Sequence, residues 1–283
     1  KMAKMNLAIR GIPCDLGEKA ANTFTNDLHK DLRADFIMAN PPFNQKDWRE
    51  ENELTQDSRW DGYVVPPTSN ANYGWILHMV SKLSQNGIAG FLLANGALSG
   101  EGQELEIRKQ LIENNLIEAI VILPRNLFYT TDISVTLWIL NKNKKARMVQ
   151  QNGKTRKFRA REDEVLFMDL RQMGSPYEKK YVELTQEERN KVTGTFHNWQ
   201  NDNNDYQNVP EFCYSAKKSE IVEKGYTLVP SRYIEFVNRD ETADFDTTMK
   251  TLQTELTDLL KQEEESKKEL LNVFKDLGYE IKL

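Results

Sequence analysis

The 283-residue sequence is poor in the side chains that hold metal ions or disulfide frameworks. It has two cysteines, Cys14 and Cys213, and three histidines, His29, His78 and His197, and none of them stands at metal-ligand spacing. We therefore expect a reduced, cytoplasmic protein without a disulfide framework or a metal site.

Long apolar runs and an excess of positive charge are also missing. No apolar run approaches the roughly 20 residues that span a bilayer, so we expect no membrane partner. The formal net charge is −5, whereas a protein that binds DNA by charge alone would be basic overall. Any contact with DNA must therefore come from a local patch or be shared with a partner.

Apolar runs alternate with amphipathic segments in the first half of the chain. Four runs have the length and composition of buried strands: residues 35–39, 88–94, 117–123 and 134–140. Residues 73–86 and 102–115 have helical periodicity. This order predicts a doubly wound α/β sheet covered by helices. The last two strands have no helix between them, so we expect them to pair as an antiparallel hairpin.

Residues 142–161 hold nine basic residues and no acidic one. Asn152-Gly153 lies inside this stretch and predicts a hairpin turn. The nine cations are candidate contacts to DNA phosphates: Lys142, Lys144, Lys145, Arg147, Lys154, Arg156, Lys157, Arg159 and Arg161. The alternative is a solvated hairpin face with no ligand.

Residues 240–277 have the pattern of one long helix. Apolar residues recur with a 3.5-residue period, which predicts a coiled-coil seam that needs a partner. The seam residues are Phe245, Met249, Leu252, Leu256, Leu259, Leu270, Val273 and Leu277. Packing against this chain's own domain is the alternative. The predicted organisation is a catalytic part over 1–141, an extension with a basic hairpin over 142–236, and a helical tail over 237–283.

Asn40-Pro41-Pro42-Phe43 directly follows the 35–39 run. The exocyclic amine of adenine is barely basic, because its lone pair is delocalised into the ring, so an enzyme that methylates it must place acceptors at its hydrogens. The side-chain oxygen of Asn40 and the carbonyl of Pro41 can be those acceptors, in a turn that prolines stiffen. Phe43 can stack on a base flipped out of the duplex. Alternatively, the two prolines merely end a strand.

Several segments in the same order resemble the N-6 adenine DNA methylases, and in particular the modification subunits of type I restriction–modification systems. The segments are residues 35–44, 70–79, 87–96, 123–129 and 228–233. The resemblance implies a class I methyltransferase fold that methylates adenine N6 in DNA with S-adenosylmethionine. It also implies that Asn40, Pro41, Pro42 and Phe43 hold the flipped adenine, and that Phe128, or its rival Tyr129, closes the other face of the base.

The resemblance implies partners as well. They are duplex DNA with a flipped adenine, a specificity subunit bound through the tail helix, and also a restriction subunit and a second modification subunit. The specificity subunit would read the DNA sequence. Trp60 and Tyr63 lie in a long polar loop that either orders over DNA or packs onto its own domain.

The glycine-rich loop and the acidic residue with which this family binds S-adenosylmethionine are missing from the sequence. We therefore expect the main cofactor loop to lie outside this chain, and the chain alone to be inactive. Asn40 and, more weakly, Asn22 are the cofactor contacts that remain. The 35–39 strand should then lack a neighbour on one side and expose an apolar edge.

Two other functions stay open. Enzymes that methylate glutamine side chains in proteins share the Asn-Pro-Pro-aromatic motif, although Phe43 and the long tail count against them. A non-catalytic interaction fragment without a cofactor site is the second alternative. Calorimetry with S-adenosylmethionine would separate this fragment from an enzyme.

Overall fold

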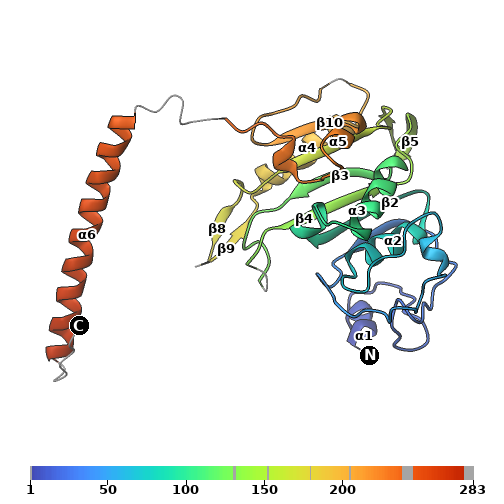
Figure 1. Cartoon of the computed structure of the whole chain (residues 1–283), viewed down its shortest axis with the longest axis horizontal. Helices are drawn as coiled ribbons and strands as arrows, with labels where there is room; N and C mark the ends of the chain where they lie inside the picture. The colour runs from blue at the N-terminus through green and yellow to red at the C-terminus, as the bar shows by residue number, and fades with distance from the viewer. Residues whose placement is uncertain are drawn as a thin grey trace. The chain divides into compact units, whose positions relative to one another are not determined.

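The computed structural model describes residues 2–129, 132–151, 153–178, 180–203, 205–237 and 245–276. The chain separates into two units, Lys1–Phe236 and Val237–Leu283 (Figure 1).

A six-stranded mixed sheet forms the centre of the first unit. Its strands lie in the order β1-β2-β4-β3-β7-β10. Their bounds are β1 Ala34–Ala39, β2 Leu83–Ala94, β3 Ile117–Ile122, β4 Val135–Asn141, β7 Glu164–Asp169 and β10 Cys213–Lys217. β1 is parallel to β2, and β3 is parallel to β7. β4 is antiparallel to both its neighbours, β2 and β3, and β10 is antiparallel to β7. The α/β sheet and the antiparallel β3–β4 hairpin expected from the sequence are confirmed.

Helices cover the two faces of this sheet. The helices of the first unit are α1 Met2–Ile9, α2 Asn72–Lys82, α3 Gln103–Glu113, α4 Gln186–Gln200 and α5 Lys218–Glu223, and the 3₁₀ turns are η1 Ser58–Trp60, η2 Asn95–Leu98 and η3 Pro230–Arg232. Because side chains alternate along a strand, Ile120 packs in the cluster under α2 and α3, whereas Val121 packs in the cluster that contains Trp199 of α4. The sheet therefore has two separate apolar faces.

β1 lies at the edge of the sheet and is not the buried strand that its apolar sequence predicts. Phe36 is 74 % exposed and Met38 is 94 % exposed, while Ile37 and Ala39 pack against the core. The prediction of burial was wrong, since a short apolar run does not show whether helices cover both of its faces. The expected apolar edge without a neighbour is present among the described residues.

The long loop between β1 and α2 packs onto its own domain. Trp48 and Trp60 are buried, and their indole N–H groups donate to the carbonyls of Pro67 at 2.7 Å and Leu54 at 2.8 Å. Tyr63 is half-buried against the same core. Of the two interpretations of Trp60 and Tyr63, packing is the one that the structure supports.

Two small hairpins extend from the unit. The predicted basic hairpin is confirmed as β5 Arg147–Gln151 paired with β6 Lys154–Phe158. A second hairpin pairs β8 Ser175–Tyr177 with β9 Tyr181–Glu183. β5 and the β8–β9 hairpin lie at opposite sides of the unit (Figure 1).

The described part of the second unit is one helix, α6 Phe245–Asp276. The long helix is confirmed, and six seam residues on it are exposed: Met249, Leu252, Leu256, Leu259, Leu270 and Val273. Leu277 and the side chain of Phe245 lie outside the described residues. Coiled-coil pairing stays a prediction. No helix in the described ranges is long and apolar enough to cross a membrane.

Candidate active site

The carboxyl ends of β1, β2, β3 and β7 meet at one edge of the sheet, because the pairings make these four strands parallel to one another. Open α/β sheets bind their ligands at this edge. Asn40 follows β1, Asn95 follows β2, and the segment from Leu123 to Tyr129 follows β3. The topology thus brings the Asn-Pro-Pro-Phe motif and the 123–129 segment to the same edge.

The Asn-Pro-Pro-Phe turn presents one free polar group. Asn40 is exposed, and its side-chain amide makes no hydrogen bond with any residue that the structure describes. Pro41 is buried, Pro42 is exposed and Phe43 is half-buried. The turn is therefore anchored by Pro41 and Phe43, and the amide of Asn40 is left available.

Phe43 and Phe128 reach the same apolar cluster from different strand ends. Both are half-buried and pack against the face of the sheet that holds Val121 and Met168. The sequence predicted both rings as faces of an adenine site. The structure places them on one side of the sheet.

Tyr129 has a different environment from Phe128. It is 66 % exposed, and its ring lies 4.7 Å from that of Tyr181 with an interplanar angle of 64°. The neighbouring Tyr177 raises the pKa of the Tyr129 hydroxyl. Tyr129 thus forms a group with two tyrosines of the β8–β9 hairpin, Tyr177 and Tyr181.

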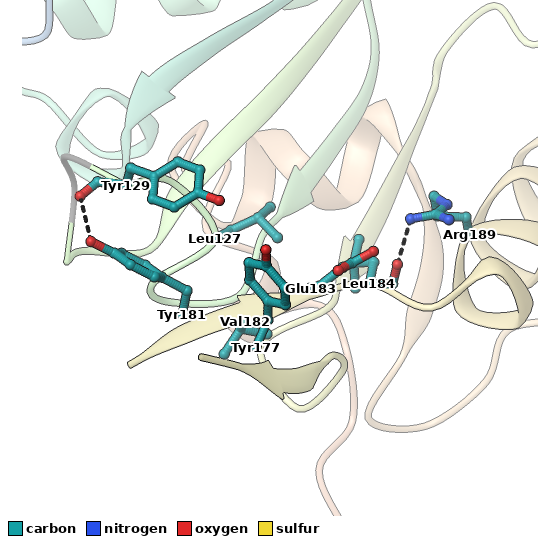
Figure 2. Close-up of a pocket in the computed structure, with 8 residues that line it drawn as sticks. All are labelled: Leu127, Tyr129, Tyr177, Tyr181, Val182, Glu183, Leu184 and Arg189. Atoms are coloured by element: carbon teal, nitrogen blue, oxygen red, sulfur yellow. Dashed lines mark hydrogen bonds between the residues drawn. The ribbon is translucent and has the colours of Figure 1, made fainter. Parts of the chain in front are cut away.

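A cavity of about 340 Å³ lies beside this group of tyrosines. It is lined by Leu127, Tyr129, Tyr177, Tyr181, Val182, Glu183, Leu184 and Arg189 (Figure 2). The N–H of Val182 donates to the carbonyl of Asn126 at 3.1 Å, which ties the hairpin to the 123–129 segment. Sequence reasoning missed this cavity, because the three tyrosines come from segments about 50 positions apart.

The turn that follows Phe43 is bonded to the start of α2. The backbone N–H of Asn44 donates to Oδ1 of Asn72 at 3.0 Å, and Nδ2 of Asn72 donates to Oδ1 of Asn44 at 2.9 Å. Asn72 is 1 % exposed. Sequence reasoning missed this pairing, because both residues look like ordinary polar residues at the ends of a loop.

Two further polar groups lie at the carboxyl ends of the parallel strands, and sequence reasoning missed them as well. Thr136 donates to Oδ1 of Asn95 at 2.6 Å. Asp169, at the end of β7, is buried and accepts from Nε and Nη2 of Arg171 at 3.0 and 2.6 Å. This bond raises the pKa of the Arg171 guanidinium and fixes its charge at the edge.

Asn22, the weaker cofactor candidate, is engaged within its own turn. Its Oδ1 accepts from the backbone N–H of Phe24 at 2.8 Å and from that of Thr25 at 3.4 Å. Phe24 in turn packs on Trp48 and Trp75, with ring centroids 4.3 and 4.2 Å away. Asn22 therefore shapes the loop and its oxygen is not free for a ligand.

The basic stretch lies at the opposite edge of the sheet, and part of it points inward. Arg161 is fully buried, and its Nε donates to Oε1 of the buried Glu118 at 2.9 Å. Lys144 is 3 % exposed and donates to the carbonyls of Ile117 and Glu164 at 2.9 and 2.6 Å. Burial lowers the pKa of Lys144 to about 8. The prediction that Lys144 and Arg161 contact phosphates is corrected, because neither can reach solvent.

Most of the other cations in the stretch also have partners. Arg156 donates to Asn201 and Gln200, Arg159 to Glu164 and the carbonyl of Trp199, Arg147 to the carbonyl of Asn143, and Lys157 to Asp202. Lys142 and Lys145 are exposed, and Nζ of Lys142 donates to the carbonyl of Leu83 at 3.1 Å. The side chain of Lys154 lies outside the described residues. Of the described cations, Lys142, Lys145 and Lys157 remain the most accessible candidates.

Comparison with known proteins identifies the family of the chain. Residues 1–242 match the family described as N-6 DNA Methylase. The chain belongs to this family. It is 39 % identical over 282 residues to the type I restriction enzyme HindI methylase subunit of Haemophilus influenzae, and 34 % identical over 284 residues to the MjaIX methylase subunit of Methanocaldococcus jannaschii.

These alignments cover 99 % of this N-6 DNA methylase chain but only 60 % and 48 % of the two relatives. Among solved structures, the type I restriction–modification methyltransferase subunit from Streptococcus thermophilus is similar with a TM-score of 0.69 and 26 % identity, over 83 % of this chain and 46 % of that one. The EcoKI M protein, at 16 % identity and a TM-score of 0.59 over 84 % and 52 % of the two chains, supports the fold.

Proposed function

We propose that this chain carries the adenine-binding part of a DNA methyltransferase that transfers a methyl group from S-adenosylmethionine to adenine N6. It would act as the modification subunit of a type I restriction–modification complex. Family membership and the named methylase relatives support the reaction class. The free amide of Asn40 at the carboxyl end of β1, in a turn held by buried neighbours, is the observation that carries the proposal.

The chemistry follows from two neutral acceptors. Oδ1 of Asn40 and the carbonyl oxygen of Pro41 accept hydrogen bonds from the adenine amine and draw its lone pair out of conjugation. As that nitrogen bonds to the methyl carbon, the bond from this carbon to the sulfonium sulfur would break and leave a neutral thioether. The nitrogen would gain the positive charge, which the same two oxygens stabilise until it loses a proton to water. Prolines preorganise the acceptors, so little reorganisation accompanies the reaction.

Aromatic side chains would hold the flipped base. Phe43 supplies one ring, and Phe128, which packs against the same cluster, supplies the other. Tyr129 is the weaker candidate because its ring already packs against Tyr181. Stacking on these rings offsets part of the cost of flipping, which is a few kcal/mol, roughly.

The residues of this chain fit one wall of a cofactor site. Asn40 fits by position and chemistry, since it is an unpaired neutral amide at the ligand-binding edge of the sheet. Asn22 does not fit, because Phe24 and Thr25 occupy its oxygen. When bound, S-adenosylmethionine supplies an electrophilic methyl group, and Asn40 would help to align the amine with it. We propose that the main cofactor loop lies elsewhere.

Replacement of Asn40 by Ala tests the reaction. In the full-length protein assembled with its partner subunits, we expect the methylation rate to fall by about 10²–10³-fold, equivalent to ~3–4 kcal/mol, with a much smaller change in cofactor affinity. Radiolabelled methyl transfer to DNA measures the rate. Asn86→Ala, an exposed asparagine in β2, is the matched control and should leave it unchanged. Near wild-type adenine methylation by Asn40→Ala would remove the assignment.

We further propose that α6 binds the coiled coil of a specificity subunit. Its exposed apolar seam is unfavourable in water without a partner. Leu252→Asp combined with Leu259→Asp should abolish co-purification of the specificity subunit while leaving the first unit folded. Thr254→Asp combined with Lys261→Asp changes positions about 200° around the helix and serves as control. Retention of the complex by the leucine variant would count against the proposal.

A further inference from the structure

The Asn-Pro-Pro-Phe turn depends on an outside support, because its own backbone offers few donors. Pro41 and Pro42 have no N–H, so neither can close the turn with a backbone hydrogen bond. Asn44, two residues after Pro42, has a φ of 51°, in the left-handed region that asparagine and glycine tolerate better than other residues. The turn therefore ends at a residue whose conformation must be held from elsewhere.

Asn72 supplies that support through two reciprocal hydrogen bonds. Its Oδ1 accepts from the N–H of Asn44 at 3.0 Å, and its Nδ2 donates to Oδ1 of Asn44 at 2.9 Å. The bonds link positions 28 apart in the sequence. A parallel backbone bond from the N–H of Ala71 to the carbonyl of Gln45, at 2.9 Å, joins the same two segments.

Asn72 itself is rigidly placed. It begins α2 and is 1 % exposed, and its N–H donates to Oδ1 of Asn70 at 3.0 Å. The next residue, Tyr73, is fully buried and donates its hydroxyl to the carbonyl of Ala97 at 2.7 Å. The Asn44–Asn72 pair thus connects the turn to the packed core.

We propose that Asn72 is a positioning residue for methyl transfer, which acts through Asn44 to fix where Asn40 and the Pro41 carbonyl meet the adenine amine. The inference rests on the proposed function and deepens it. Asn72 is buried and acts through Asn44, without touching substrate or cofactor. Its loss would leave the acceptors present but displaced, and a displacement of about 1 Å can cost about 10²-fold in rate.

The directions of the two hydrogen bonds make positions 44 and 72 unequal. An aspartate at position 44 can still accept from Nδ2 of Asn72 at an exposed site. An aspartate at position 72 loses that donor and faces the oxygen of Asn44 from a buried position. Two substitutions of equal size and charge should therefore have unequal effects.

Steady-state methylation by the full-length protein, assembled with its partner subunits, tests this with Asn72→Ala, Asn72→Asp, Asn44→Gly and Asn44→Asp. We expect kcat to fall by about 10²-fold in both Asn72 variants, with little change in the KM for S-adenosylmethionine. Asn44→Asp should lose clearly less than Asn72→Asp. Asn141→Ala is the matched control: Asn141 is equally buried but bonds to Glu118 at the other edge of the sheet. It should lower Tm and leave kcat unchanged.

Asn40→Ala, measured beside these variants, separates the two proposals. Normal activity of Asn40→Ala would overturn the proposed function itself. If Asn40→Ala is impaired while Asn72→Asp keeps the wild-type kcat, or if Asn44→Asp and Asn72→Asp lose equally, the positioning role is wrong. If the Asn72 variants fail to fold, Asn44→Gly keeps the left-handed conformation at an exposed position, and an unchanged kcat in that variant overturns the inference.

Discussion

Polar groups have opposite environments at the carboxyl ends and at the amino ends of the parallel strands β1, β2, β3 and β7, here called the carboxyl edge and the amino edge. At the carboxyl edge, Asn40 is exposed and its amide is unpaired among the described residues. At the amino edge, Glu118 is fully buried and accepts from Arg161 at 2.9 Å, Asn141 at 2.6 Å and Gln200 at 3.1 Å. One edge leaves a neutral amide unpaired, and the other satisfies a charge inside the fold.

This difference shows that density of charge is a poor guide to function in this chain. The nine-cation stretch is its most prominent electrostatic feature, yet two of those cations are buried and several others bond to neighbouring carboxylates, amides or carbonyls. A buried ion pair needs such partners because leaving water costs each charge several kcal/mol. The group without a partner is the better candidate for chemistry.

Breaking the amino edge should give the largest effect on stability. Arg161→Met leaves the Glu118 carboxylate buried without its ion-pair partner, so we expect the free energy of unfolding to fall by about 3–5 kcal/mol. Urea denaturation followed by tryptophan fluorescence measures it. Methylation below the unfolding temperature should not change.

Removing both charges of the Arg161–Glu118 ion pair is a second test of the same comparison. Arg161→Met combined with Glu118→Leu should recover only part of the lost stability: the unpaired carboxylate is gone, but Asn141 and Gln200 lose their acceptor and the buried Lys144 loses a neighbouring negative charge. A loss of kcat in either variant with unchanged stability would contradict the division between a structural edge and a functional one.

At the carboxyl edge, Phe128 and Tyr129 should differ. Base–aromatic stacking is worth about 1–3 kcal/mol, so Phe128→Ala should weaken binding of DNA with an unpaired target adenine by roughly 5- to 150-fold. Tyr129→Ala should do less. Fluorescence of 2-aminopurine at the target position reports the flipped base. A larger effect of Tyr129→Ala would move the base site toward the cavity in Figure 2.

The smallest effect is expected from the accessible lysines of the amino edge. Lys142→Gln, Lys145→Gln and Lys157→Gln together should weaken DNA binding equally for all sequences. The slope of log K against log salt is negative for DNA binding. For each phosphate contact that the substitutions remove, this slope should become shallower by about 0.9. An unchanged slope in a fluorescence-anisotropy titration would make this edge wholly structural.

The sequence predicted features whose cause is local. Four of the sheet strands were found because their apolar runs are continuous, and the turn at Asn40 because two prolines and an aromatic follow such a run. It could not show that β1 is the outermost strand of the sheet, because Phe36 and Met38 are equally typical of a strand that is covered on both faces.

Long-range pairing could not be predicted either. Arg161 bonds to Glu118 across 43 positions, and Asn44 bonds to Asn72 across 28. The residues that flank each of them in the sequence do not indicate which partner it has. The sequence therefore located the Asn-Pro-Pro-Phe motif but not the Asn44–Asn72 pair that holds it. It showed how many cations the 142–161 stretch contains, but not which of them have hydrogen-bond or ion-pair partners.

The Asn44–Asn72 pair also makes the loop between these two residues a suitable place for an inserted label. The pair closes the loop at its base, while Asp61 and Gly62 lie exposed at a turn where Gly62 has a φ of 82°. Because doubling the length of a flexible loop adds only about 0.6 kcal/mol of closure cost, a peptide tag or a dye-bearing cysteine grafted between these two residues should leave the Asn44–Asn72 pair in place. Such a label would report whether this loop, which packs onto its own domain, moves when DNA is added.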